Sequence, residues 1–273
     1  MVITCHLMGG LGNQLFQIFA TIANSLQSQY QSQYVFLNQA MLGVRHTAWN
    51  TLLVALRPHL VSSLPHNMMR IDEQEFSYNP LPNVANANVA FVGYFQSEKY
   101  FKPYYKHIYD ILEIGIRRDE LKQKLVELEG TQVTISIHFR IGDYKNIQHC
   151  HPLMPLSYYV KSLTHIQSNT LVTRVVYFCE DVDLNDVLKM VEQLITQFPN
   201  YTFVRCNPKL ADWEQMLYMS FCNHHIIANS SFSWWGAYFN PLKEKIVCYP
   251  STWFGSGVAG DTKDLCPPEW VKI

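Results

Sequence analysis

A short apolar stretch runs directly into a glycine-rich turn and then a helix-like pattern, and this order restricts the chain to a narrow group of folds. Residues 2–7 are the apolar stretch, and Gly9, Gly10 and Gly12 follow at once. After the turn, apolar residues recur at helical spacing, namely Leu15, Phe16, Phe19, Ile22, Ala23 and Leu26. Strand, glycine turn and helix in this order open an α/β unit.

The same alternation of strand and helix returns in the second half of the chain. Strands are predicted at 34–37, 89–94, 131–139, 174–179, 201–205, 225–228 and 246–249. Helices are predicted at 100–112, 117–129 (ended by Gly130), 157–166, 184–198, 212–222 and from 233 onward. The proline-rich stretch from about 40 to 90 is expected to be irregular. Alternation on this scale predicts parallel sheets in two domains, residues 1–125 and 126–273.

Composition excludes several classes of function. The chain has 273 residues, of which 48% are hydrophobic, enough for two cores. Its 21 basic and 22 acidic residues give a formal net charge of −1, so we expect no nucleic-acid partner. The N-terminus lacks the pattern of a signal peptide, and no apolar run reaches about 18 residues. We therefore expect no stable membrane insertion and a cytoplasmic or otherwise soluble protein.

The possible metal ligands are poorly arranged. The seven cysteines are scattered and form no C-x-x-C pair, which argues against a disulfide framework or a zinc knuckle. In His149-Cys150-His151, adjacent side chains rarely reach one ion together. A D-x-D pair at Asp181 and Asp183 is the acidic pattern that holds a divalent metal in some nucleotide-sugar enzymes. We expect no metal and no cofactor, although this pair keeps the alternative open.

The glycine turn is the first of three segments that could carry chemistry. Its glycines allow close approach of a ligand to the backbone, and the N–H groups at a helix N-terminus suit an anion. The spacing around Gly10 and Gly12 is not G-x-G-x-x-G, and no Lys-Ser or Lys-Thr pair makes it a P-loop. A plain tight turn is the alternative.

The second segment, residues 138–144, ends a predicted strand. His138 and Arg140 alternate with apolar neighbours, so both should share one face. The planar guanidinium fork of Arg140 matches phosphate oxygens, and it could stabilise a departing nucleoside diphosphate without a metal. The alternative is an exposed ion pair between Arg140 and Asp143 beside a buried, hydrogen-bonded histidine.

The third segment, residues 229–237, places small hydroxyl side chains just before a predicted helix. Ser231 and Ser233 could cap this helix or bind phosphate, since both roles use the same N-terminal field. The acidic cluster Glu180-Asp181-Val182-Asp183 follows a predicted strand and could cap the helix that begins near Leu184. Asp181 could equally accept hydrogen bonds from a guanine.

Taken together, the three segments resemble the alpha-1,2-fucosyltransferase family. Residues 9–17 (GGLGNQLFQ) look like its N-terminal signature, residues 138–144 like its H-x-R-x-G-D-Y motif, and residues 231–237 like its third block. The resemblance implies an α/β, GT-B-type fold with two Rossmann-like domains facing across a cleft. It also implies GDP-β-L-fucose as co-substrate, inversion at the anomeric carbon and no metal. The acceptor implied is O2 of a terminal β-galactose on a glycan.

The resemblance also suggests roles for individual residues. Arg140 should hold the β-phosphate, His138 should contact the nucleotide, and Asp181 should recognise guanine. The phosphates should lie on Ser231, Phe232 and Ser233. The turn of the other domain should bind the donor through Gly10, Gly12, Asn13 and Gln14. Asn13 should reach the fucose or phosphate from across the cleft, and it is a candidate catalytic residue together with Arg140 and Asp143. Asp143 is our first choice of general base, with Tyr144 and His6 as lesser candidates.

This chain departs from the family pattern in three places. Ile141 stands where many members have a second arginine, and Cys179-Glu180 replaces a common Ser-Asp. The animal members carry an N-terminal membrane anchor, whereas this sequence begins at the first predicted strand. Transfer in another linkage (alpha-1,6 or to protein) and a non-catalytic binding protein that kept the pocket remain alternatives. No motif identifies the acceptor or the oligomeric state.

Overall fold

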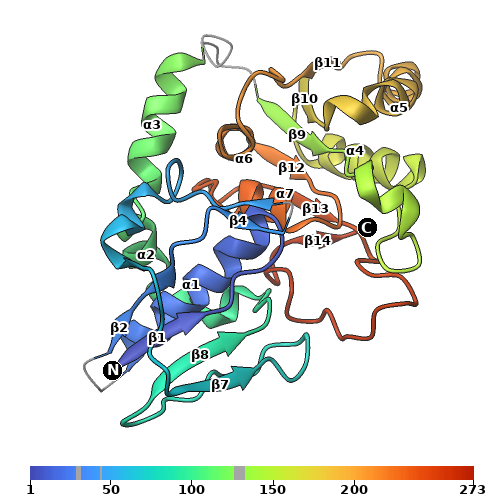
Figure 1. Ribbon diagram of the computed structural model, residues 1–273. Helices are drawn as coiled ribbons and strands as arrows, with labels where there is room; N and C mark the ends of the chain where they lie inside the picture. Colours follow the sequence, from blue (N-terminus) through green and yellow to red (C-terminus); the bar gives the residue numbers. More distant parts are fainter. Residues whose placement is uncertain (29–31, 44, 126–132) are drawn as a thin grey trace. The chain divides into compact units, whose positions relative to one another are not determined.

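Two parallel sheets organise the protein, one in each half of the chain (Figure 1). The computed structural model describes residues 1–28, 32–43, 45–125 and 133–273. It divides into one unit of Met1–Asp119 with Gly260–Pro267, and a second of Glu120–Ala259 with Pro268–Ile273. Among the described residues, no helix combines the length and apolar character needed to cross a bilayer.

The sheet of the first unit has the strand order β2-β1-β8-β7, with all neighbours parallel. Its strands are β1 (Val2–Cys5), β2 (Gln33–Tyr34), β7 (Met68–Asp72) and β8 (Asn88–Val92). The long helix α1 (Leu11–Gln27) follows β1 and the glycine turn, and it packs against β1. Leu15, Phe16 and Phe19 of this helix are fully buried, so the helical spacing read from the sequence marks its core face.

The remaining elements of the first unit are short. They are β3 (Phe36–Leu37), β4 (Met41–Leu42), β5 (Arg45–His46), β6 (Leu60–Val61), the 3-10 helices Val54–His59, Glu98–Tyr100 and Lys102–Tyr104, and the helix α2 (Tyr105–Ile111). Helix α3 (Ile114–Lys124) runs across the boundary between the units. Gly130, expected to end that helix, lies outside the described residues.

Strand β7 lies in the region that we expected to be irregular. None of its five residues is buried, because it is the edge strand of its sheet. It therefore lacks both the apolar run and the strict alternation that reveal a strand. The predicted strand at 34–37 is instead two short strands, β2 and β3, which join different sheets.

The second unit has a six-stranded parallel sheet in the order β11-β10-β9-β12-β13-β14. Its strands are β9 (Thr134–His138), β10 (Arg174–Phe178), β11 (Thr202–Arg205), β12 (His224–Ile226), β13 (Val247–Tyr249) and β14 (Val271–Lys272). Its helices are α4 (Leu156–Asn169), α5 (Leu184–Gln197), α6 (Asp212–Met219) and α7 (Ser231–Tyr238), with 3-10 turns at Gly142–Asn146 and Asp181–Asp183.

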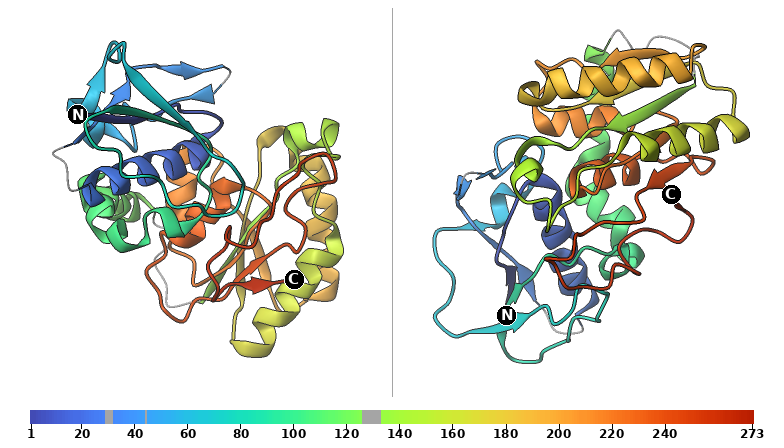
Figure 2. Two further views of the ribbon diagram at one scale, coloured as in Figure 1. Left: turned by 90° about the horizontal axis from the view of Figure 1, so that it is seen from below. Right: turned by 90° about the vertical axis from the view of Figure 1, so that its right-hand side faces the viewer.

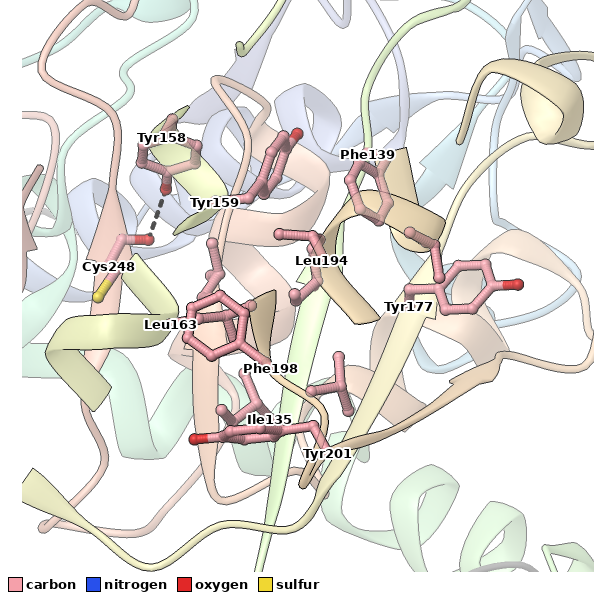
Figure 3. Close-up of a cluster of buried hydrophobic side chains, with 14 of the residues drawn as sticks. Ile135, Phe139, Tyr158, Tyr159, Leu163, Tyr177, Leu194, Phe198, Tyr201 and Cys248 are labelled. Atoms are coloured by element: carbon pink, nitrogen blue, oxygen red, sulfur yellow. Dashed lines mark hydrogen bonds between the residues drawn. The ribbon is translucent and has the colours of Figure 1, made fainter. Parts of the chain in front are cut away.

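Helices cover both faces of this sheet (Figure 2). On one face Ile135 of β9 packs with Leu163 of α4 and Leu194 of α5 in a cluster of buried side chains (Figure 3). On the other face Phe178 of β10 meets Tyr218 of α6 edge-on, at 5.7 Å between ring centroids. Strand β9 lies inside the sheet with neighbours on both sides, so its carboxyl end has a fixed position.

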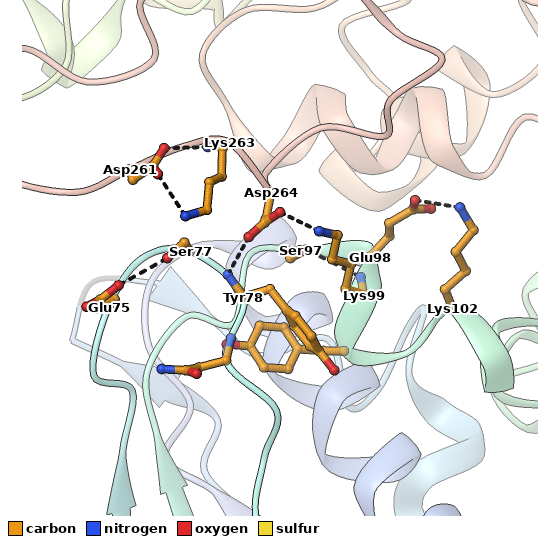
Figure 4. A network of polar contacts seen from close by, with 12 residues as sticks. Glu75, Ser77, Tyr78, Ser97, Glu98, Lys99, Lys102, Asp261, Lys263 and Asp264 are labelled. Atoms are coloured by element: carbon orange, nitrogen blue, oxygen red, sulfur yellow. Dashed lines mark hydrogen bonds and ion pairs between the residues drawn. The ribbon is translucent and has the colours of Figure 1, made fainter.

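The segment Gly260–Pro267 belongs to the first unit, whereas we expected one boundary after residue 125. Asp264 accepts a hydrogen bond from the backbone N–H of Tyr78 (3.1 Å) and pairs with Lys99 Nζ (2.5 Å), as Figure 4 shows. These partners are more than 150 positions away along the chain, and a local sequence pattern carries no sign of such a contact.

The glycine turn allows a matched test of stability. Gly9 has φ +74°, and a Cβ there would lie 2.5 Å from Asn13 Nδ2, whereas a Cβ on Gly10 would have nothing within 4 Å. A side chain in the left-handed region costs roughly 1–2 kcal/mol. We expect Gly9→Ala to lower the melting temperature clearly more than Gly10→Ala does. Equal losses in thermal unfolding of the two variants would contradict this account.

Candidate functional site

Arg140 follows the carboxyl end of β9 and is held on several sides. Its guanidinium pairs with the carboxylates of Glu180 and Asp143, and its Cζ lies 4.9 Å from the ring centroid of Tyr144. The side chain is 16% exposed, whereas Glu180 and Asp143 are about half exposed. The ion pair with Asp143 that we considered as an alternative is therefore present, and Glu180 adds a second.

The surroundings of Arg140 keep its positive charge. Burial alone would lower the pKa of its guanidinium, but the charges of Glu180 and Asp143 outweigh burial and raise this pKa. The result is a permanent cation that is largely shielded from water. An anion that binds here gains from the lower local dielectric, and it competes with two carboxylates for the same N–H groups.

The turn after Arg140 is tied down by Asp183. Gly142, with φ +34°, donates its N–H to Asp183 Oδ2 at 2.6 Å. Lys145 Nζ lies 3.4 Å from Asp183 Oδ1 and 2.8 Å from Asp186 Oδ2. Asp183, the second acid of the D-x-D pair, is buried and satisfied by these contacts. It acts as a structural anchor of the Gly142–Asn146 turn.

Asp181 is exposed, and its carboxylate pairs with Arg205 at the end of β11. Asp183, a member of the same acidic cluster, occupies the N-cap position of α5, but its side chain makes no capping hydrogen bond there. Among the described residues, no group of three or more His, Cys, Asp and Glu side chains is arranged to hold a metal ion.

His138 ends β9 as a buried, neutral ring. It is 8% exposed, and burial, helped by the positive charge of Arg140, lowers its pKa to about 3. Its ring centroid lies 5.5 Å from that of Phe232, which brings the second and third sequence segments together. Within the described chain, His138 Nδ1 has no hydrogen-bond partner. The satisfied core histidine considered from sequence is therefore not what the structure contains.

The N-terminus of α7 is capped by Ser230, which the sequence analysis did not select. Its hydroxyl accepts a hydrogen bond from the N–H of Phe232 at 3.3 Å. The Ser233 hydroxyl is buried and donates to the carbonyl of Ser230, while Ser231 and Phe232 are partly exposed. The sequence does contain a signal for this role, since a serine directly before a helix is a favoured N-cap residue.

Asn229 is a second residue that sequence reasoning missed. Its side-chain amide donates to the carbonyls of Pro152 and Trp253, both at 3.0 Å. Its own carbonyl accepts the hydroxyl of Tyr144 at 3.2 Å. One residue thus joins the loop after β9, the segment around Trp253 and the start of α7. Only the fold reveals this role, because the three partners are distant in sequence.

The predicted residues of the glycine turn lie in the first unit. Gly10 is the N-cap of α1, and Asn13 Oδ1 accepts a hydrogen bond from Gln96 Nε2 at 2.7 Å. Gln14 is fully buried and donates to the carbonyls of Gly9 (3.0 Å) and His46 (3.1 Å). Gln14 thus holds the turn in place through these two hydrogen bonds, whereas a Cβ on Gly10 would meet no atom within 4 Å.

Comparison with known proteins gives a family match over almost the entire chain. The family model described as glycosyl transferase family 11 matches residues 2–273. A curated relative, the alpha-1,2-colitosyltransferase of Escherichia coli, is 25% identical over an alignment that covers 100% of this chain and 99% of the relative.

Solved structures agree on the fold. NodZ alpha-1,6-fucosyltransferase, in a crystal soaked with GDP-fucose, is 13% identical with a TM-score of 0.50, covering 88% of this chain and 92% of that one. ADP-heptose lipopolysaccharide heptosyltransferase II of E. coli has a TM-score of 0.53 at 10% identity, with 100% and 89% covered. Both are GT-B-type glycosyltransferases, which confirms the expected fold class.

The burial of His138 makes stability sensitive to acid. The pKa of this ring falls from about 6.5 to about 3 on folding. Below pH 6.5 the unfolded chain therefore binds a proton that the folded protein excludes, so the free energy of unfolding decreases as the pH falls from 6.5 toward 3. Between pH 7 and pH 5 the loss amounts to about 2 kcal/mol. We expect His138→Gln to lose less unfolding free energy over this interval than the unaltered chain does.

The control is His66→Gln, which removes an imidazole from an exposed position. The measurement is denaturant unfolding at the two pH values. If His138→Gln and His66→Gln lost the same free energy between pH 7 and pH 5, the assignment of a neutral, buried His138 would be wrong.

Proposed function

The chain belongs to glycosyl transferase family 11, and on that premise we propose that it transfers L-fucose from GDP-β-L-fucose to a glycan, at O2 of a terminal β-galactose. The observation that carries the proposal is Arg140, a shielded and permanently charged guanidinium at the carboxyl end of a central strand. Ligands of open α/β sheets collect at this edge, and a departing diphosphate needs a fixed positive charge there.

The proposed reaction is one in-line displacement with inversion. The acceptor oxygen forms a bond to the anomeric carbon while the bond from that carbon to the β-phosphate oxygen breaks. GDP takes the bonding electrons, and a base takes the proton of the acceptor hydroxyl. Negative charge grows on the β-phosphate in an oxocarbenium-like transition state, as in glycoside cleavage. Arg140 would stabilise that charge, with the N–H groups at the start of α7 as second donors.

The other donor contacts follow from the same arrangement. Neutral His138 lies beside Phe232, so both would contact the nucleotide, while Ser231 is exposed enough to reach a phosphate. Ser233 would act through its backbone, because its hydroxyl already bonds Ser230. For Asp181 to bind guanine, it would have to exchange its partner Arg205 for the base. Gly10, Gly12 and Asn13 are our candidates in the first unit.

Asp143 stays our proposal for the base, and its ion pair with Arg140 gives it a second role in orienting the guanidinium. We propose that no metal takes part. Support comes from Asp183, which would be the second ligand of a D-x-D metal site but anchors the turn at Gly142 instead.

Colitose is the second candidate for the transferred sugar, and the full-length relative that is an alpha-1,2-colitosyltransferase favours it. Colitose is fucose without its 3-hydroxyl, so the two donors differ by one hydrogen-bonding group. A site built to bond that hydroxyl would reject the deoxy sugar strongly, whereas an apolar site would discriminate weakly.

The donor proposal is tested by release of GDP. We expect GDP release from GDP-fucose when lactose or a β-galactose-terminated glycan is added, and a chelator should leave the rate unchanged. GDP-colitose serves as the competing donor, and linkage analysis of the product identifies the acceptor oxygen. A product with another linkage would overturn the galactose O2 assignment. Binding of GDP-fucose without turnover on a glycan panel would make the chain a binding protein.

The role of Arg140 is tested by substitution. Arg140→Ala should lower kcat by roughly 10²–10³, the usual cost of losing one donor to a developing negative charge. Arg140→Lys should recover part of this loss, because it keeps the charge but not the planar fork. The control is Arg70→Ala, which breaks an exposed arginine–carboxylate pair with Asp72 in the first unit. Wild-type turnover by Arg140→Ala would remove the basis of the proposed mechanism.

A further inference from the structure

His151, the last residue of the His149-Cys150-His151 triplet, belongs to an aromatic stack that contacts Arg140 through Tyr144. Its ring stacks on that of Tyr144, with centroids 4.7 Å apart and planes 19° from parallel. Phe254 meets His151 edge-on at 5.5 Å. Burial lowers the pKa of His151, so its ring favours the neutral form that stacks well. The triplet thus contributes an aromatic surface.

Tyr144 connects this stack to the guanidinium. The same ring that stacks on His151 lies 4.9 Å from Arg140 Cζ, within the range of a cation–π contact. The Tyr144 hydroxyl donates to the carbonyl of Asn229, directly before the N-terminal turn of α7. Tyr144 is therefore fixed both by its ring contacts and by its hydroxyl. Because this hydroxyl donates its proton to a backbone carbonyl, it is poorly suited to act as a base.

The residues that support His151 are also tightly fixed. Gly255 N–H donates to the carbonyl of Cys150 at 2.9 Å, and Gly257 N–H donates to the carbonyl of His149 at 2.7 Å. A Cβ on Gly255 would lie only 2.3 Å from the His149 carbonyl oxygen, so only glycine at position 255 allows the two backbone segments to lie this close together. Asn229 holds both Pro152 and Trp253, the residues beside His151 and Phe254. The stack consequently has little freedom to shift.

We propose that Tyr144 and His151 are positioning residues that fix the plane of the Arg140 guanidinium for the departing diphosphate. This inference rests on the proposed function. Glu180 and Asp143 contact the N–H edges of the guanidinium, where the phosphate oxygens would also bind. A bound donor therefore competes with both carboxylates, whereas the aromatic contact uses a face and persists. The stack keeps the cation aligned when its ion pairs loosen.

The test compares His151→Ala, His151→Phe and the control His149→Ala, which removes an exposed imidazole from the same triplet. A displaced catalytic group can cost about 100-fold in rate, so we expect His151→Ala to lower kcat by about tenfold to 100-fold. KM for the donor should change little by comparison. His151→Phe restores a stacking ring and should recover most of kcat, and His149→Ala should behave as the unaltered chain.

Crystal structures of the same variants soaked with inorganic pyrophosphate, an anion that competes with both carboxylates for the guanidinium, give a readout that does not depend on the sugar donor. We expect the Arg140 guanidinium to leave its plane in His151→Ala and to keep it in His151→Phe. An unmoved guanidinium in His151→Ala would overturn the inference, and so would a His151→Phe variant as inactive as His151→Ala, since the imidazole itself would then be required. If the unaltered chain releases no GDP from GDP-fucose, the proposed donor fails, while the position of Arg140 in the variants still decides this inference.

Discussion

The site of this protein depends on one cation that is kept charged and out of bulk water. Arg140 has carboxylates at its N–H edges and an aromatic ring at its side. Asp143 and Tyr144 come from the turn that follows β9, and Glu180 comes from the segment after β10. This arrangement keeps the guanidinium both shielded from water and paired with opposite charges. A free guanidinium in water would be strongly hydrated, and a buried one without partners would be costly. The carboxylates of Glu180 and Asp143, each about half exposed, balance the charge.

Several features of the site follow from the position of β9 inside its sheet. Ile135 and Ile137 point into the core beneath α4 and α5, so the alternate residues Ser136 and His138 belong to the opposite face. That face carries Phe232 of α7 next to His138. Two segments separated by about 90 residues in sequence thereby form one surface. The neutral state of His138 is a consequence of this burial, and it leaves Arg140 as the fixed positive charge beside it.

The sequence was most informative where local pattern and burial coincide. Strands β9 and β10 and helix α5 appear close to their predicted bounds, because continuous apolar runs and helical spacing reflect the core directly. Edge strand β7 carried no such signal. Within the site, the pairing of Arg140 with Asp143 was foreseeable from their spacing. The roles of Glu180, Asn229 and His151 were not, since each depends on contacts between loops that only the fold brings together.

The return of Gly260–Pro267 to the first unit means that the polypeptide changes unit at three points along its length. A fragment ending at residue 259 would strip Lys99 and the Tyr78 amide of their shared carboxylate. Engineers who exchange the first unit between family members would therefore have to carry residues 260–267 along with the N-terminal portion. The first unit is thus built from two stretches that are not contiguous along the chain.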